Sequence, residues 1–309
     1  MSEAITILRA RARRLAKLIC ADGTIVDWDK ARTFDLIEIA VADIDALDRL
    51  LRRLEGRRDC CVVRGAIADP MHVKAVRRLL HPDRNTGDKP TLREVPRRWL
   101  ALDFDLSSRP DWLDPADLFS CARFAIETLP KAFRHARFIV QATGGHGLKP
   151  GIRIRLWCWL SRPTIGAELK YWLRRVPVDP SIFGAAHIIY TASPQIQAGA
   201  FDPLTSRFAV VSGEEAVIVP SAHRLKPPKT VRLPRDEAAE PDSVDRLVRF
   251  VETAAPGNRN AALYWATCRV AEQNCANDHT ATLLEDAAVR AGLSEAEAAA
   301  TIKSGLRHE

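Results

Sequence analysis

The sequence predicts an α/β (α+β) fold, in which a domain built on a mixed sheet is followed by a small domain made only of helices. Short segments of alternating apolar and polar residues recur up to residue 219, between segments of helical periodicity. A proline-rich, charged segment follows at 220–242, and its composition is typical of a linker. We therefore expect a sheet-containing domain over 1–225, a linker over 226–242 and a helical domain over 243–309.

The N-terminal part of the first domain, about 1–95, is expected to be a small module of helices and strands. Residues 4–20 place leucine and isoleucine among several arginines at helical spacing, which predicts a basic amphipathic first helix. The remaining elements of this module are expected to be a strand over 34–41, a helix over 43–54, a strand over 60–67 and a turn-rich, basic loop over 68–94.

The second part of this domain, about 96–225, holds the segments with the clearest chemistry. Its expected elements are strands over 99–106, 138–142, 152–160, 187–192 and 208–211, and helices over 115–129 and 166–175. A glycine-rich loop at 143–151 lacks the Gly-Lys-Ser/Thr ending of a P-loop, which excludes a Walker-type ATPase site there. The helical domain is expected to contain helices over 243–253, 258–273 and 280–291, and one that begins with a capping box at Ser294.

The most informative segment is 99–106, which reads Trp-Leu-Ala-Leu-Asp-Phe-Asp-Leu. In a strand its leucine and phenylalanine side chains point to one face, whereas Asp103 and Asp105 point to the other. Their Cα atoms would lie roughly 6.6 Å apart, a spacing that suits one or two divalent metal ions. Without a metal, the two charges would repel by about 2–3 kcal/mol at an effective dielectric constant of ~20. The alternative interpretation is an edge strand with a solvated acidic face.

A second informative strand is expected over 152–160, where Arg153 and Arg155 share one face. If this strand neighbours the acidic one, the two arginines and Lys149 of the preceding loop could hold a triphosphate. A pair of solvated arginines is the alternative. Asp179 follows a short apolar segment and could be a third carboxylate of the same site, although Asp-Pro is also a common turn sequence.

The charge balance favours a polyanionic partner such as nucleic acid. Lys and Arg number 46 against 39 Asp and Glu, which gives a formal net charge of +7 and a sequence pI near 9.2. No apolar run is long enough to span a bilayer, and no secretory signal is evident, so we expect a cytoplasmic protein without a membrane partner. The seven cysteines include no Cys-x-x-Cys pair and are interpreted as reduced thiols.

Taken together, these segments resemble the archaeo-eukaryotic primase superfamily, and within it the primase-polymerases of phages, plasmids and other mobile elements. The Asp-x-Asp motif of that family matches Asp103-Phe104-Asp105, and its later aspartate matches Val178-Asp179. The stretches Leu148 to Gly151 and Asp202 to Leu204 are also similar to mobile-element members. The tail, with Gly257-Asn258-Arg259, resembles the helical primase domain that often follows the catalytic core.

The resemblance implies an RRM-like catalytic core and two-metal nucleotidyl transfer on a single-stranded DNA template with NTP or dNTP substrates. The family motifs assign Asp103, Asp105 and Asp179 as ligands of two Mg²⁺ or Mn²⁺ ions. Within this interpretation we expect Arg153, Arg155 and Lys149 to contact the triphosphate, and the basic residues Arg97, Arg98 and Arg259 to contact the template. Arg155 occupies the position of the family's histidine; a guanidinium can bind phosphate but cannot act as a base. Larger members of the family also carry a helicase domain, which this sequence does not contain, so we expect a separate replicative helicase among the partners.

Two alternatives come from other classes of protein. A non-catalytic single-stranded DNA-binding or replication-initiation module would keep the basic surface but would have no need of three convergent carboxylates. A metal-dependent sugar transferase could also use Asp-x-Asp, but the basic pI and the helical tail fit it poorly. Steep salt dependence of binding to single-stranded DNA would exclude the sugar transferase.

Overall fold

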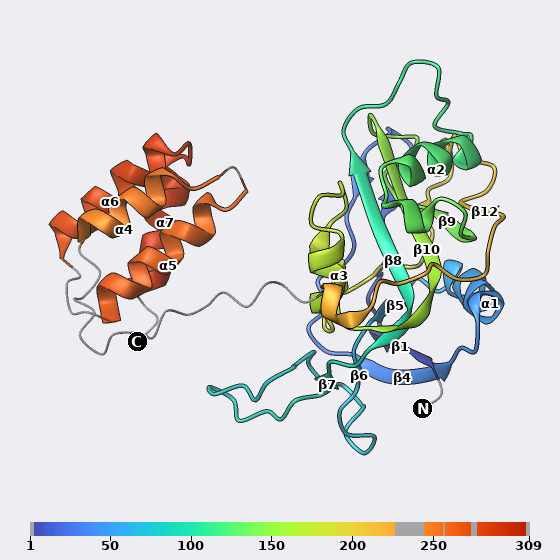
Figure 1. The fold of residues 1–309 in the computed structure, drawn as a ribbon, viewed down its shortest axis with the longest axis horizontal. Coiled ribbons are helices and arrows are strands. Elements are labelled where there is room, and N and C mark those ends of the chain that lie inside the picture. Colours follow the sequence, from blue (N-terminus) through green and yellow to red (C-terminus); the bar gives the residue numbers. More distant parts are fainter. Residues whose placement is uncertain (1–2, 226–243, 256, 273–276, 307–309) are drawn as a thin grey trace. The chain divides into compact units, whose positions relative to one another are not determined.

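The computed structural model describes residues 3–225, 244–255, 257–272 and 277–306, which belong to two compact units (Figure 1). The units are Met1–Pro228 and Lys229–Glu309, and each has its own hydrophobic core. The boundary between them falls inside the segment predicted as a linker, which itself lies outside the described residues.

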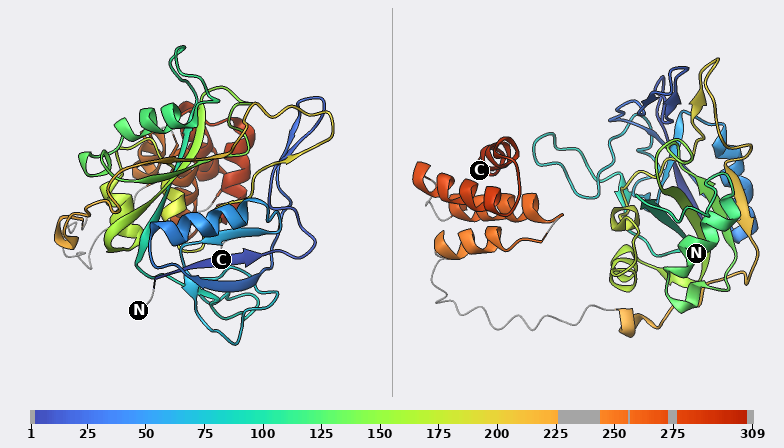
Figure 2. Two further views of the ribbon diagram at one scale, coloured as in Figure 1. Left: turned by 90° about the vertical axis from the view of Figure 1, so that its right-hand side faces the viewer. Right: turned by 90° about the horizontal axis from the view of Figure 1, so that it is seen from above.

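The first unit begins with a three-stranded antiparallel sheet that carries one helix. Its strand order is β4-β1-β5, and its elements are β1 (Ala4–Arg9), β4 (Asp35–Ala40), β5 (Cys60–Val63) and α1 (Ile44–Glu55). Leu47 and Leu51 of α1 are buried in one core with Ile5 and Ile7 of β1, so the helix packs on one face of this sheet (Figure 2). The strand, helix and strand predicted between residues 34 and 67 are confirmed, although the second strand ends at Val63 and is followed by a separate short one.

The helix predicted over 4–20 is wrong, because this segment contains β1 and ends with the short strand β2 (Leu18–Ile19). β1 is the central strand of its sheet and is buried from Ala4 to Leu8. Ile5 and Ile7 face the core that includes α1, whereas Leu8 belongs to a separate cluster on the other face. A central strand with apolar residues on both faces can match a helical spacing by coincidence, and this is the physical reason for the error.

The second sheet of this unit carries the acidic strand at its edge. Its order is β12-β9-β10-β8, antiparallel throughout. Its strands are β8 (Arg97–Leu106), β9 (Phe138–Ala142), β10 (Ile152–Thr164) and β12 (Phe208–Val211), and the helices of this part are α2 (Leu118–Glu127) and α3 (Gly166–Trp172). α2 connects β8 to β9, and β10 lies between these two strands, which is a split β-α-β arrangement (Figure 1).

One face of β8 and β10 changes from apolar to charged along its length. At one end the rings of Trp99 and Trp157 are fully buried with centroids 6.0 Å apart, and the Trp99 indole N–H donates to the carbonyl of Ala4 in the first sheet at 2.9 Å. At the other end the same face carries Asp103 and Asp105. The first sheet therefore covers the tryptophan end and leaves the acidic end open.

Short elements complete the first unit. They are β3 (Ile25–Val26), β6 (Ala66–Ile67), β7 (Leu92–Arg93), β11 (Gln195–Ile196) and the 3-10 turns Lys131–Phe133, Pro180–Phe183 and Ala222–Leu225. The strand predicted over 187–192 is wrong, since only Ile189 forms an isolated bridge, with Val62. The next two carbonyl groups, of Tyr190 and Thr191, accept hydrogen bonds from side chains of the second sheet and not from a neighbouring strand.

The second unit is a bundle of helices, as the sequence predicts for this part of the chain. The helices are α4 (Val244–Glu252), α5 (Arg259–Glu272), α6 (Asp278–Arg290) and α7 (Glu295–Leu306). Leu247, Leu263, Leu284 and Ile302 meet in its core. The predicted capping box is present, because the Ser294 hydroxyl accepts from the Glu297 amide at 3.3 Å and the Glu297 carboxylate accepts from the Ser294 amide at 3.2 Å. Within the described residues, every helix is too short or too polar to cross a membrane.

Candidate active site

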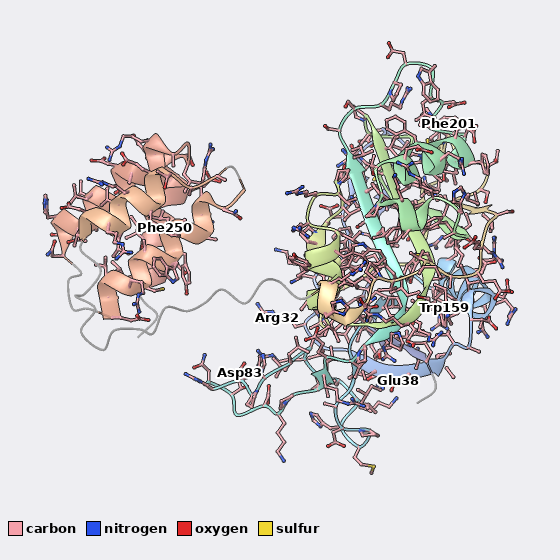
Figure 3. All side chains as sticks on the ribbon, viewed as in Figure 1. Arg32, Glu38, Asp83, Trp159, Phe201 and Phe250 are labelled. Atoms are coloured by element: carbon pink, nitrogen blue, oxygen red, sulfur yellow. The ribbon has the colours of Figure 1, made fainter. Side chains whose placement is uncertain are left out.

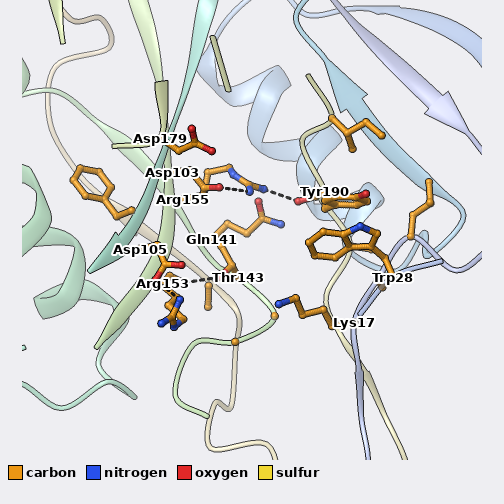
Figure 4. A pocket seen from close by; sticks show the side chains of 18 of the residues that line it. Lys17, Trp28, Asp103, Asp105, Gln141, Thr143, Arg153, Arg155, Asp179 and Tyr190 are labelled. Atoms are coloured by element: carbon orange, nitrogen blue, oxygen red, sulfur yellow. Dashed lines mark hydrogen bonds and ion pairs between the residues drawn. The ribbon is translucent and has the colours of Figure 1, made fainter. Parts of the chain in front are cut away.

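The two carboxylates of β8 each lie directly opposite an arginine of β10. The register of the antiparallel pair places Asp103 opposite Arg155 and Asp105 opposite Arg153. Directly opposite residues of an antiparallel pair share a face and have Cβ atoms about 4.5–5.5 Å apart. The arginine strand and the acidic strand are thus neighbours, which is the condition for the two arginines to act at the acidic site (Figure 4).

Both cross-strand pairs form ion pairs, but in different environments. Arg155 Nη2 lies 3.0 Å from Asp103 Oδ2, and Arg155 Nη1 donates to the Tyr190 carbonyl at 2.5 Å. The side chain of Arg155 is only 7% exposed, whereas that of Asp105, which pairs with Arg153, is 71% exposed. The Asp103 pair is therefore a fixed, largely dehydrated contact, and the Asp105 pair lies at the solvent edge, where ion pairs contribute little.

Each arginine keeps one donor without a partner. The Nε–H groups of Arg153 and Arg155 are both buried and have no hydrogen-bond acceptor among the described residues. A buried donor without an acceptor costs about 1–3 kcal/mol. The hydrogen-bonding capacity of the two guanidinium groups is therefore not fully used within the described residues.

Asp179 lies beside Asp103 although 76 residues separate them in the sequence. Its backbone amide donates to the carbonyl of Asp103 at 3.1 Å. Its carboxylate caps the 3-10 turn Pro180–Phe183, accepting from the Ser181 amide at 2.8 Å and from the Ser181 hydroxyl at 2.7 Å. The backbone contact brings the third predicted carboxylate to the same end of β8 as the first two.

A cavity of about 570 Å³ lies over these side chains, within the first unit. The predicted residues that line it are Asp103, Asp105, Lys149, Arg153, Arg155 and Asp179. Lys149 is exposed and follows Gly145 and Gly147 in the loop before β10. The structure therefore brings six of the nine predicted site residues to one cavity.

Several further residues of the cavity could not be found by sequence reasoning. Trp28 and Tyr190 stack with ring centroids 4.0 Å apart, and Lys17 Nζ lies 5.3 Å from the centroid of Trp28 (Figure 4). Burial raises the pKa of Tyr190 to about 12, so its phenol stays protonated. Lys17 belongs to the segment 4–20, where the predicted helix is wrong, and Trp28 lies in a segment for which the sequence predicts no element. No local pattern links either residue to the acidic strand.

His187 is a histidine of the cavity that the comparison of motifs misses. Its Nε2 lies 3.4 Å from the Ser181 hydroxyl, which in turn donates to Asp179. Burial lowers the pKa of His187, whereas the neighbouring carboxylate of Asp179 raises it and Arg78 lowers it. The net shift is downward, so the imidazole is neutral at pH 7 and its nitrogens can accept as well as donate.

A buried histidine positions the backbone of Arg153. His146 Nδ1 accepts from the Arg153 amide at 3.1 Å, and His146 Nε2 lies 2.8 Å from the Pro115 carbonyl. Because a carbonyl can only accept, Nε2 carries the proton and the ring is the neutral Nε2–H tautomer. Burial lowers the pKa of His146, which favours this neutral form.

The three predicted template contacts lie outside this cavity. Arg97 is 5% exposed, and its guanidinium bonds to the Arg64 carbonyl at 3.1 Å and to Glu38 at 2.9 Å. These internal bonds correct the expectation for Arg97, because a guanidinium held in the interior does not reach a template. Arg98 is half-buried, and the strand alternation turns it to the face opposite the carboxylates. Arg259 belongs to the second unit, where its Nη1 lies 3.4 Å from the Gly292 carbonyl.

The three carboxylates are of the chemical type that binds divalent cations, but their side chains are not arranged around a common metal position. Among the residues that the structure describes, no group of three or more His, Cys, Asp or Glu side chains is close enough to hold a metal ion. Two of the three carboxylates are instead engaged by arginines, and Asp179 is engaged by Ser181. Oxygen donors of this kind are the ligands that Mg²⁺ and Mn²⁺ prefer, but binding would require these side chains to exchange partners.

Comparison with known proteins adds little to this geometry. No protein-family model matches the chain, and no curated protein matches it. Among solved structures, the chain is similar to the crystal structure of primase RepB′, with 9% sequence identity and a TM-score of 0.32, over 99% of this chain and 88% of that chain. A TM-score of this size does not establish a shared fold, and no function is inferred from it.

Proposed function

We propose that the chain is a DNA-dependent nucleotidyltransferase that synthesises primers on single-stranded DNA and extends them. The observation that carries this proposal is the register of β8 and β10, which sets Asp103 and Asp105 against Arg155 and Arg153 at the open end of one sheet face. Nucleotidyl transfer needs acidic groups for cations and basic groups for a triphosphate within one cavity. The pattern of strands supports the proposal further, since a split β-α-β unit is part of an RRM-like sheet.

In this proposal Asp103, Asp105 and Asp179 would hold two Mg²⁺ or Mn²⁺ ions. When bound, such ions neutralise the triphosphate and lower the pKa of an attacking 3′-hydroxyl. The chain's own part is to place the three carboxylates at one end of β8, which it does through the strand alternation and through the backbone bond between Asp179 and Asp103.

The arginines would bind the triphosphate and would not transfer protons. Arg155 is held between Asp103 and the Tyr190 carbonyl, so its position is set before a ligand arrives. Arg153 and Lys149 are closer to solvent and would contact the outer phosphates. Arg155 is buried, and its removal from bulk water strengthens its interaction with a phosphate relative to that of a fully solvated guanidinium.

We also propose the biological setting that the sequence resemblance implies. The helical unit would act as a C-terminal primase domain that helps to hold the first two nucleotides, and Arg98 and Arg259 would contact the template. The chain would work in replication of a phage, plasmid or other mobile element, beside a separate helicase. Either NTP or dNTP is a possible substrate, because no described side chain has been assigned to the sugar.

A second candidate is a non-catalytic single-stranded DNA-binding or replication-initiation module. One observation favours it: the carboxylates of Asp103 and Asp105 are already neutralised by arginines, as in a purely structural pair of ion pairs. Such a module would keep its affinity for DNA but would transfer no nucleotide.

The test incubates the full chain with unprimed single-stranded DNA, labelled NTP or dNTP, and Mg²⁺ or Mn²⁺. A variant with Asp103→Asn and Asp105→Asn is compared with a control carrying Asp111→Asn and Glu127→Gln, two exposed acids outside the cavity. We expect short products from the wild type and the control only. Extension of a primed template without initiation would indicate a polymerase. DNA binding with neither reaction would contradict the proposal and favour the binding module.

A further inference from the structure

The first unit has two further hollows with basic walls, and one of them shares a lining residue with the active-site cavity. One, of about 440 Å³, is lined by residues of β1, the segment after it and the segment 30–35. The other, of about 690 Å³, is lined by residues 31–33 and by the loop that contains Arg77, Arg78 and Asp83 (Figure 3). The two hollows share residues 31–33, and the second shares Arg78 with the active-site cavity. The three hollows thus follow one another in space.

The charges along this path are unbalanced. The first hollow is lined by one carboxylate, Asp35, and by five cations, which are Arg9, Arg11, Arg13, Lys30 and Arg32. Asp35 is already paired with Arg11 at 2.9 Å, and Asp83 of the second hollow is paired with Arg77 at 2.7 Å. Each of the two carboxylates that line these hollows is therefore already paired with an arginine and does not neutralise the remaining cations.

Four cations remain without a carboxylate partner among the described residues, and we call them the basic track: Arg13, Lys30, Arg32 and Arg78. The first three are exposed, whereas Arg78 is half-buried, bonds to the Ala186 carbonyl and lies over the ring of Phe34. Cations gathered without counter-ions repel one another, and such a surface attracts polyanions. Because the track extends along two hollows that share residues 31–33, it suits a chain of phosphates better than a single phosphate.

We propose that the basic track binds the sugar-phosphate backbone of single-stranded DNA and leads it into the active-site cavity. This inference rests on the proposed function and gives the template a binding site in place of Arg97. The active-site cavity, which Arg78 of the track also lines, contains an aromatic stack of Trp28 and Tyr190 beside Lys17. A positive groove with aromatic rings at its side is the combination by which proteins bind single strands without regard to sequence.

The test measures binding of the full chain to an oligothymidylate of twenty nucleotides, without metal or free nucleotide, over a range of salt concentrations. The variant carries Arg13→Ala, Lys30→Ala and Arg32→Ala. The matched control carries Arg49→Ala, Arg53→Ala and Lys131→Ala, which removes the same charges from exposed positions outside the three hollows. Both variants should fold, because none of these six side chains has an ion pair or hydrogen bond within the described residues.

Each phosphate contact on a single strand contributes about −0.7 to the slope of log K against log salt concentration. We expect the track variant to lower the magnitude of the slope by roughly 2 and the affinity at 0.1 M salt by at least about tenfold. The control should change both much less. Equal effects in the two variants would overturn the proposal, since net charge alone would then explain them.

Two further measurements distinguish this proposal from a triphosphate site and from failure of the proposed nucleotidyl transfer. Binding of a labelled nucleoside triphosphate should be unchanged in the track variant. If nucleotide binding is lost while oligonucleotide binding persists, the track is a triphosphate site and the proposal is wrong. If the track variant loses DNA binding and the wild type proves unable to add nucleotides, the track stands and the proposed nucleotidyl transfer fails.

Discussion

Arg155 and Asp103 face one another across the pair β8 and β10, with Arg155 Nη2 3.0 Å from Asp103 Oδ2. The arginine is 7% exposed and the aspartate 28%, so the pair is largely removed from water. In a chain without a ligand, the guanidinium offsets the repulsion that Asp103 and Asp105 would otherwise exert on each other. The same guanidinium lines the cavity, and this gives the pair a role in both stability and binding.

The first prediction is a measurable coupling between these two residues. We expect a double-mutant cycle with Asp103→Asn and Arg155→Met to give a coupling free energy of unfolding of about 1–3 kcal/mol in metal-free buffer, because either single change leaves a partly buried charge unpaired. Chemical denaturation of the four proteins measures it. Additive effects of the two changes would show that the ion pair does not contribute.

The second prediction concerns competition between a metal and the arginines. Mn²⁺ at about ten times its dissociation constant should raise the free energy of unfolding of the wild type by up to about 1.4 kcal/mol. The Asp103→Asn/Asp105→Asn variant should lose this gain, and the Asp111→Asn/Glu127→Gln control should keep it. Thermal unfolding with and without Mn²⁺ measures the gain, and the electron paramagnetic resonance signal of free Mn²⁺ reports binding directly. An equal gain in all three proteins would remove the carboxylates as the metal site.

The sequence predicts the four strands of the second sheet, and in two of them, β8 and β10, apolar and polar residues alternate clearly. Asp103 and Asp105 on one strand and Arg153 and Arg155 on another are each visible as period-two patterns, and their shared face follows once the strands are neighbours. The alternation does not reveal the register. A shift of one residue in the pairing of β8 and β10 would separate both Asp–Arg pairs. The observed pairing is therefore set by the fold and not by the alternation alone.

The first strand, β1, and the cavity residues Trp28 and Tyr190 could not be predicted in the same way. β1 is buried on both faces, so its apolar residues do not alternate, and the basic residues at its end and after it favour a basic amphipathic helix. Trp28 and Tyr190 meet across 162 residues of sequence, in segments without regular structure. Contacts of this kind depend on tertiary packing, which leaves no periodic signal.

The third prediction is that His146 contributes to the pH dependence of the free energy of unfolding. Its pKa is lowered by burial, so the unfolded chain binds a proton more readily, and stability should rise with pH. Its contribution is fully present above the unfolded value of about 6.5 and declines as pH falls below it. His187 shifts in the same direction, so the measurement must isolate His146.

A comparison with His146→Gln achieves this isolation. We expect the difference in unfolding free energy between wild type and variant to be largest above pH 7 and to shrink between about pH 6.5 and 5. The His187→Gln variant, measured in parallel, should keep the part of the pH dependence that belongs to His146. A difference that stays constant with pH would mean that His146 is not held in its neutral form.

The fourth prediction concerns Gly151, which ends the loop before β10 and immediately precedes the register pair Ile152 and Leu106. Its φ is +88°, and a Cβ atom there would lie 1.8 Å from the carbonyl oxygen of Leu106, the last residue of β8. We expect Gly151→Ala to lower the free energy of unfolding by about 2–4 kcal/mol, because the strand ends must move apart. Gly56→Ala is the control, since Gly56 has φ −81° and open space around it, and it should change stability by less than about 0.5 kcal/mol.

Because the clash lies two residues from Arg153, the Gly151→Ala variant should also bind nucleoside triphosphate more weakly at temperatures where it is folded. A Gly151→Ala protein as stable as the Gly56→Ala control would show that this turn does not set the register.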